Sequence, residues 1–256
     1  MNALTVRFNV ISALILRDMR TRFGRSYLGY LIAVGWPFSH LVVLVGAMAY
    51  VRRLAPMGGD PAIWAITGVL PYILCLYPAR IMGYAIEHNR ALFFFPVVKA
   101  SDVIISRAIV EFMTATIVVV LAFVVAAIIG IDVIPIDSFV LASGVLMTIY
   151  LSLSIGILNN IMASIFRMWH LVFILCIIVM YLSSGTIIAV DTLSAELRDA
   201  IWYNPLFHCV EWIRSSYYEG YGDGVVSKHY VFWVATANLL ISLSGERFLR
   251  GKILQP

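Results

Sequence analysis

Apolar runs recur along this chain, and short polar or turn-rich segments separate them. A helix needs about 20 apolar residues to cross the hydrocarbon layer of a bilayer. We therefore predict an all-α integral membrane protein, a single transmembrane domain over residues 1–256 with six transmembrane helices. The predicted spans are Leu31–Val51, Ala62–Tyr84, Val103–Gly130, Phe139–Leu158, Met168–Val190 and Tyr230–Leu249.

Residues 1–28 precede the first span and form a predicted interface segment. Within Asn2–Thr21, Arg17 and Arg20 follow a set of apolar residues: Val6, Phe8, Val10, Ile11, Leu14 and Ile15. This pattern suits a helix lying along the membrane surface. The same arginines also suit a plain topology anchor, and the sequence leaves both interpretations open.

The segment 191–229, between the fifth and sixth spans, is long for a simple loop. Its many apolar and aromatic residues make it too apolar for water, and Asn204, Pro205 and Gly220 interrupt it too often for a span. Non-helical backbone at membrane depth is tolerated only where protein or a water-filled cavity surrounds it. We predict a pair of short re-entrant or interfacial half-helices here, ahead of the last span at 230–249.

Composition places the chain in the same class. Hydrophobic residues make up 62% of it and charged residues only 12%, about half the usual share of a soluble domain. The net charge is +4, but the basic residues lie at the ends of the predicted spans and do not form a stripe, which argues against nucleic acid as a partner. The three cysteines fall in different segments, so no disulfide framework is expected.

A cluster of arginines orients the chain. Basic residues ahead of the first span are costly to translocate, so the N-terminus is predicted to be cytoplasmic. With six spans the C-terminus is cytoplasmic too, and the even-numbered loops then hold Arg90, Lys99 and Arg167 on that side. The arginines of the cluster are Arg7, Arg17, Arg20, Arg22 and Arg25.

Motifs of enzymes are scarce in the sequence. The tail from Gly245 to Ile253 has five residues between its glycines where a P-loop needs four, and it lacks the Ser or Thr that should follow the lysine. The five histidines are scattered, so no metal site is predicted. Arg107 and Glu111 lie one helical turn apart, and a structural ion pair is favoured there over a gating role.

The segment before the last span is rich in aromatic residues. Such rings collect at membrane interfaces in any case. Rings with polar edges also form a surface on which a sugar can pack. The residues concerned are Trp202, Tyr203, His208, Trp212, Tyr217, Tyr218 and Tyr221.

Three stretches carry a resemblance to a known family. They are LILRDMRTRFGRSYLGYLIAVGWP at Leu14–Pro37, NRALFFFPVVKASDVIISRAIVEF at Asn89–Phe112 and YNPLFHCVEWIRSSYYEGY at Tyr203–Tyr221. In this order they resemble the first-span entry, the turn between spans two and three, and the segment before the last span of ABC-2 type permeases, in particular capsular polysaccharide exporters of the KpsM type.

The resemblance implies a homodimer in the bacterial inner membrane, paired with two copies of a separate ATPase that binds ATP and Mg, with no cofactor in this chain. It also allows periplasmic and outer-membrane export components. In such permeases a surface helix and the turn after the second span dock on the ATPase. The corresponding coupling residues here are Ile86, Glu87, His88, Asn89, Arg90 and Leu92.

The leading hypothesis is export of a lipid-linked acidic polysaccharide, driven by ATP hydrolysis on the partner. Arginine pairs strongly with phosphate and carboxylate groups. A permease for O-antigen, teichoic acid or another lipid-linked glycan is the alternative, and an integral membrane enzyme acting on a lipid headgroup or a proton-coupled carrier is disfavoured. The predicted substrate-binding residues are Arg20, Arg22, Arg25, Trp202, Tyr203, His208, Trp212, Tyr217 and Tyr218.

Overall fold

The computed structural model describes residues 3–22, 27–50, 60–222, 224–248 and 251. Helices make up the described chain, and it contains no strand in those ranges. The elements are α1 (Ala3–Arg22), α2 (Tyr27–Tyr50), α3 (Pro61–Pro71), η1 (Tyr72–Leu76), α4 (Tyr77–Met82), η2 (Glu87–Phe94), α5 (Ala100–Ile128), α6 (Ser138–Ile165), α7 (Trp169–Leu182), η3 (Val190–Thr192), α8 (Ala195–Trp202), α9 (Pro205–Arg214) and α10 (Lys228–Phe248).

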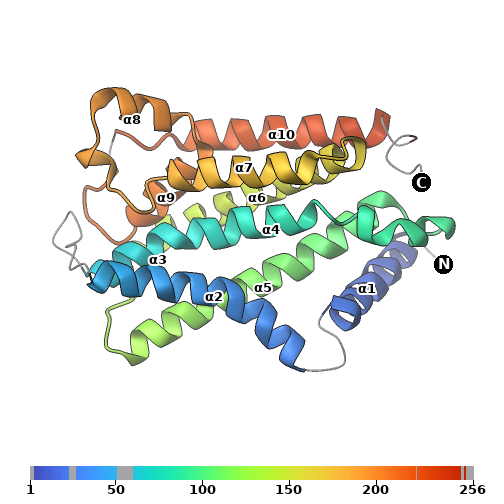
Figure 1. Ribbon diagram of the computed structural model, residues 1–256, viewed down its shortest axis with the longest axis horizontal. Helices are drawn as coiled ribbons and strands as arrows, with labels where there is room; N and C mark the ends of the chain where they lie inside the picture. The colour runs from blue at the N-terminus through green and yellow to red at the C-terminus, as the bar shows by residue number, and fades with distance from the viewer. Residues whose placement is uncertain (1–2, 23–26, 51–59, 223, 249–250, 252–256) are drawn as a thin grey trace.

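The long helices run side by side along the length of the molecule (Figure 1). We call one end of this bundle the α1 end, because α1 lies there together with η2 and the last turns of α10 (Figure 1). The other end, which carries α8 and α9, is the α9 end (Figure 1). The all-helical membrane fold predicted from the sequence is confirmed.

Four stretches of helix are long and apolar enough to cross a membrane: Gly29–Ala47, Pro61–Met82, Ala100–Ile128 and Ser138–Ile165. They correspond to the first four predicted spans. The apolar helix α7 has 14 residues, shorter than a span, and α10 has 21 residues but is more polar. The count of six spans therefore stays a prediction.

The second span occupies the centre of the bundle. In its most apolar stretch 89% of the residues are buried, compared with 17% in α2. It begins where Asp60 caps α3 by accepting the N–H of Ala62 at 2.7 Å, with Pro61 in the first turn. Between α3 and α4 the helix widens to a π-helical turn, η1. Pro78 has no N–H to donate to the preceding turn, and a local π turn is one way in which a helix accommodates this irregularity.

The segment between α7 and α10 contains two short α-helices, α8 and α9, after the 3-10 turn η3. Asn204 and Pro205 separate them: Asn204 accepts the N–H of Leu206 at 3.0 Å and so caps α9. The nine residues Leu206–Arg214 of α9 are all buried, whereas α8 has no buried residue. The re-entrant placement of this pair stays a prediction.

Candidate functional site

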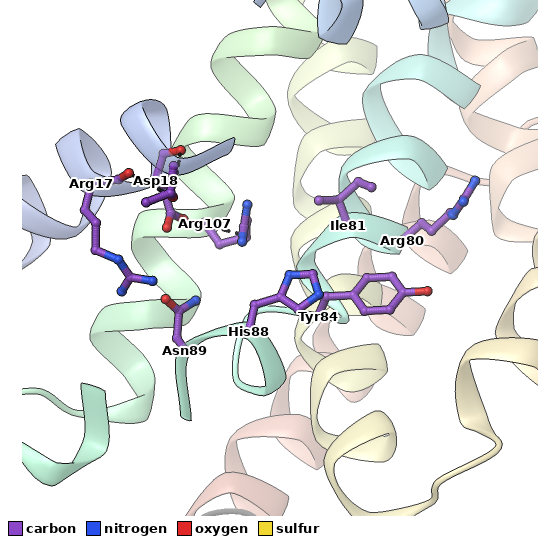
Figure 2. Close-up of a pocket in the computed structure, with 9 residues that line it drawn as sticks. Arg17, Asp18, Arg80, Ile81, Tyr84, His88, Asn89 and Arg107 are labelled. Carbon is purple, nitrogen blue, oxygen red and sulfur yellow. Dashed lines mark hydrogen bonds and ion pairs between the residues drawn. The ribbon is translucent and has the colours of Figure 1, made fainter. Parts of the chain in front are cut away.

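A cavity of about 490 Å³ opens at the α1 end, between α1, α4, the turn that follows α4, and α5 (Figure 2). Its volume falls within the usual range for small-molecule sites. The side chains that line it are Arg17, Asp18, Thr21, Arg80, Ile81, Tyr84, His88, Asn89 and Arg107.

The wall formed by α4 and its turn is anchored to α6. The amide of Asn159 donates to the carbonyl of Ala79 at 2.9 Å, and the amide of Asn160 donates to the carbonyl of Met82. The last carbonyl groups of a helix lack intrahelical partners, and Asn159 supplies one to Ala79, while Asn160 adds a second donor to Met82, which also accepts the N–H of Ala85. A Cβ at Gly83 would lie 2.2 Å from the Asn159 amide nitrogen, so only glycine fits where the chain leaves α4.

The opposite wall is α1, which packs along α5. Arg7 pairs with Asp102 at the start of α5, and Asp18 Oδ2 lies 3.5 Å from Arg107 Nε. Leu14 is buried in a cluster with Ala85 and Val103. Ion pairs near both ends of α1 and this apolar contact between them fix the helix, and with it Arg17, at the mouth of the cavity.

The cavity has an excess of positive charge. The lining includes three guanidinium groups, from Arg17, Arg80 and Arg107, and one carboxylate, that of Asp18. Arg107 is 5% exposed, and its Nη1 also lies 3.9 Å from Glu111. The pairing of Arg107 with Glu111 expected from the sequence is present, but the Asp18 carboxylate is the nearer partner.

Three buried polar atoms of cavity residues have no hydrogen-bond partner within the described part of the chain, and one of them, Nε of Arg107, lies in the ion pair with Asp18. The other two, Nη1 of Arg17 and Oδ1 of Asn89, have no charged partner of that kind among the described residues. The guanidinium group of Arg17 extends toward the amide of Asn89 (Figure 2). Because buried polar groups in folded proteins are nearly always paired, an unpaired donor beside an unpaired acceptor points to a ligand or ordered water.

An aromatic stack joins the turn to the start of α7. The Tyr84 ring lies 3.9 Å from the His170 ring at an interplanar angle of 9°, and 5.3 Å from the His88 ring. Glu87 Oε2 lies 3.0 Å from His170 Nε2. The turn is therefore held from two sides, by α6 through the asparagines and by α7 through this stack.

Comparison with known proteins decides the family. The profile of the ABC-2 type transporter family matches residues 10–218, most of the chain. The chain belongs to this family. The resemblance inferred from the three sequence stretches is confirmed.

Named relatives of this permease match it along nearly its whole length. It is 29% identical over 236 residues to the polysialic acid transport protein KpsM of Escherichia coli, covering 91% of each chain. It is 26% identical to the capsule polysaccharide export inner-membrane protein CtrC of Neisseria meningitidis, covering 98% of this chain and 95% of the relative. For BexB of Haemophilus influenzae, with the same description, the identity is 22%, covering 95% and 91%. The permease is a multi-pass inner-membrane protein.

The predicted coupling residues of the permease divide into a buried and an exposed set. Ile86 and Asn89 are buried, and Leu92 is partly buried against the cluster that includes Leu14 of α1. Glu87, His88 and Arg90 are exposed. The turn thus has a buried base, and its charged side chains stand on the surface of the α1 end.

Among the arginines predicted to bind substrate, Arg20 is exposed on α1. The side chain of Arg22 and the whole of Arg25 lie outside the described residues. The cavity arginines Arg17, Arg80 and Arg107 were not among the predicted substrate ligands. Their position within or beside apolar helices was the available signal, because charges there are costly and tend to be functional.

The predicted aromatic residues separate into two groups at the α9 end. Trp202 packs its ring 5.1 Å from that of His208 and 5.6 Å from that of Tyr203. Trp212 and Tyr218 are each 8% exposed, and Tyr217 donates its hydroxyl to Val133 at 3.2 Å. Only Tyr203, at 71%, is largely exposed, so most of these rings are engaged in packing in this conformation.

Arg214 at the α9 end is a buried charge that sequence reasoning did not single out. Its Nη1 donates to the carbonyl of Gly185 at 2.7 Å and lies 3.2 Å from Glu211, and its Nη2 donates to the carbonyl of Thr186 at 2.9 Å. Its guanidinium carbon lies 3.6 Å from the centre of the Trp64 ring. The spacing of Glu211 and Arg214 on one helix face was a weak signal for this arrangement.

Proposed function

We propose that this chain is the membrane permease of an ATP-driven exporter that moves lipid-linked capsular polysaccharide across the bacterial inner membrane. The observation that carries the proposal is the nearly whole-length match to a polysialic acid transport protein and to two inner-membrane proteins of capsule polysaccharide export. Two permease chains form the pathway, and two copies of an ATPase bind ATP and Mg²⁺ on the cytoplasmic side. The α1 end is the cytoplasmic end, so both termini are cytoplasmic.

The turn at residues 86–92 transmits movement of the ATPase to the helices of the permease. Support comes from its attachments: Asn159 and Asn160 join its root to α6, and Glu87 joins it to His170 of α7. A force on the exposed charges would therefore reach two spans at once. Such a rigid contact to several helices is what a coupling element requires.

An exporter of O-antigen or teichoic acid would need the same kind of coupling turn and the same kind of ATPase partner. The relatives named above favour a capsular polysaccharide, and periplasmic and outer-membrane components would complete the route to the cell surface. Measuring surface polysaccharide in cells that lack the chromosomal copy, with and without the cloned permease and its ATPase, separates these substrates.

The coupling role is tested by reversing two exposed charges, Glu87→Lys with Arg90→Glu. We expect the complex to assemble and hydrolyse ATP while export of polysaccharide falls at least about tenfold, because complementary charges fix the register of a protein interface. The matched control is Glu196→Lys with Arg198→Glu on α8, at the other end of the bundle, which should export normally. Normal export by the Glu87 and Arg90 variant at normal expression would contradict the assignment.

A second measurement addresses the division of labour. The purified permease should neither bind nor hydrolyse ATP, and ATPase activity should require the partner subunit. ATP turnover by the permease alone would refute the proposed function.

A further inference from the structure

We propose that the cavity at the α1 end binds an acidic sugar, a sugar acid or sugar phosphate, at the end of the exported glycan that the permease captures first. The inference rests on the proposed function and adds to it a site and a substrate chemistry. It differs from the sequence-based expectation for Arg20, Arg22 and Arg25, because the ligand here enters a cavity between helices that other residues line.

The charge of the cavity indicates that the ligand carries an anionic group. The guanidinium groups of Arg17, Arg80 and Arg107 outnumber the one carboxylate of Asp18. Arg107 and Asp18 already neutralise each other in part at 3.5 Å. The uncompensated positive charge is therefore that of Arg17 and Arg80, which lie at opposite sides of the labelled group (Figure 2). An anionic oxygen beside either of these two guanidinium groups would make charge-assisted hydrogen bonds with it.

The unpaired atoms of the cavity indicate a second group on the ligand, a hydrogen-bond donor. Asn89 is 2% exposed, and its amide nitrogen donates to the carbonyl of Ala85 at 2.7 Å, which fixes the orientation of the amide. Its Oδ1 is then left as an acceptor that needs a donor, next to the unpaired donor of Arg17. A simple anion would satisfy Arg17 and leave Asn89 unpaired. A ligand with a hydroxyl group beside its anionic oxygen satisfies both.

The aromatic wall argues against a site for neutral sugars. A neutral sugar is held mainly by packing its apolar face on an exposed ring. The Tyr84 ring is already stacked on His170 at 3.9 Å and lies close to His88. Selectivity in this cavity must come from its charged and polar groups, so an acidic sugar should be preferred over a neutral one.

Two other occupants share part of this chemistry. An acidic side chain of the ATPase would supply the anion, but the most specific groups, Asn89 and Arg107, are buried at 2% and 5% exposure, whereas a docking protein meets the exposed charges of the turn. A phosphatidylglycerol headgroup also carries hydroxyl groups beside a phosphate. The experiment therefore includes both as separate outcomes.

The test uses the full-length permease in nanodiscs of phosphatidylcholine and measures binding of a sialic acid trisaccharide and of neutral maltotriose by calorimetry. We expect the acidic trisaccharide to bind and maltotriose not to bind. Arg17→Gln and Arg80→Gln should each weaken binding about tenfold or more, which corresponds to the loss of one charge-assisted hydrogen bond. The control Arg167→Gln, an exposed arginine at the same end that does not line the cavity, should bind like the wild type.

Equal affinity of the wild type and both cavity variants, binding of maltotriose as tight as that of the acidic sugar, or absence of binding would overturn the inference. So would loss of binding when phosphatidylglycerol replaces phosphatidylcholine, or when the ATPase is added without nucleotide, since the cavity would then belong to lipid or to the partner. Export measured in parallel separates the two proposals. If Arg17→Gln exports normally and binds the sugar as the wild type does, the binding site is refuted and the proposed export function is unaffected. If the wild type binds the sugar but exports no polysaccharide, the proposed export function is refuted.

Discussion

At the α9 end of the bundle, Arg214 has both terminal nitrogens bonded to protein oxygens, whereas at the α1 end Arg17 has a buried terminal nitrogen without a hydrogen-bond partner in the described ranges. Arg214 is fully buried, and Arg17 is partly buried with one terminal nitrogen removed from solvent, and burial makes an ionised group costly. The difference lies in what compensates the charge. For Arg214 the chain supplies oxygen atoms to both terminal nitrogens, although its Nε has no hydrogen-bond partner in the described ranges, whereas the cavity beside Arg17 leaves a terminal nitrogen to be paired by another group.

The comparison also assigns different tasks to the two ends. Arg214 joins α9 to the irregular backbone after α7 and to Trp64 of α3, and non-helical backbone within a membrane protein needs such partners. The α9 end is therefore a closed, packed structure in which Arg214 holds α9, α3 and the segment after α7 together. The α1 end combines an open basic cavity with a surface turn, so binding and coupling are located side by side there.

The largest expected effect comes from removing the compensated charge. Arg214→Gln should lower the free energy of unfolding by about 3–5 kcal/mol, because it leaves Glu211 and two carbonyl groups buried without their partner. Arg17→Gln should change it by less than about 0.5 kcal/mol, since the buried nitrogen has no hydrogen bond to lose. Thermal unfolding of both variants in the same detergent measures this, and a larger loss for Arg17→Gln would reverse the comparison.

Much of the fold follows from the sequence because membrane spans depend on local composition. Runs of apolar residues and the break at Pro61 locate the first three spans to within a few residues, whereas α6 continues to Ile165, past the predicted end of the fourth span at Leu158. The interruption at Asn204 indicates two short helices without giving their bounds. The fifth run was predicted to continue to Val190, but α7 ends at Leu182. The apolar residues after it pack in a turn with Gly185 at φ +75°, and its carbonyl is bonded by Arg214, a residue distant in sequence.

The cavity could not be predicted from the sequence, because it depends on contacts between helices and not on local composition. Its arginines come from three helices, and Arg17 joins the others because α1 packs along α5, held by the Arg7–Asp102 ion pair together with the Asp18–Arg107 pair and the buried Leu14. Local patterns contain no information about such a contact. The aromatic segment before the last span shows the opposite case. The sequence identifies its aromatic residues, but packing buries Trp212 and Tyr218, so the sugar-binding surface predicted from them reduces to residues such as Tyr203.

A second prediction sharpens the description of the α9 end as closed. A Cβ at Gly68 would lie 2.6 Å from Arg214 Nη2 and 3.0 Å from the carbonyl oxygen of Thr186. Gly68→Ala should therefore cost about 1–3 kcal/mol through overpacking. Gly35→Ala is the matched control, because a Cβ at Gly35 of α2 meets nothing within 4 Å and alanine is favoured over glycine within a helix. Equal thermal stability of the two variants would mean that Arg214 can move aside, and the α9 end would not be rigid.

The smallest expected effect concerns the protonation state that the α9 end requires. His208 is fully buried, and its Nε2 donates to the carbonyl of Trp202 at 2.8 Å while its Nδ1 accepts the N–H of Ser227 at 3.2 Å. Burial lowers the pKa of His208 below its ordinary value of 6.5, so the folded protein favours the neutral ring. The unfolded chain takes up the proton first as the pH falls.

The contribution of His208 to stability is therefore complete above pH 6.5 and is lost as the pH falls below that value toward the lowered pKa. We expect the unfolding temperature of the wild type to drop between pH 7.5 and pH 5.5, by less than Gly68→Ala lowers it at neutral pH. His208→Gln, which cannot gain a charge, should flatten this dependence, whereas His229→Gln at an exposed position of the same end should keep it. The same slope in all three proteins would show that protonation of His208 does not limit the α9 end, and the pH dependence would have to arise elsewhere in the bundle.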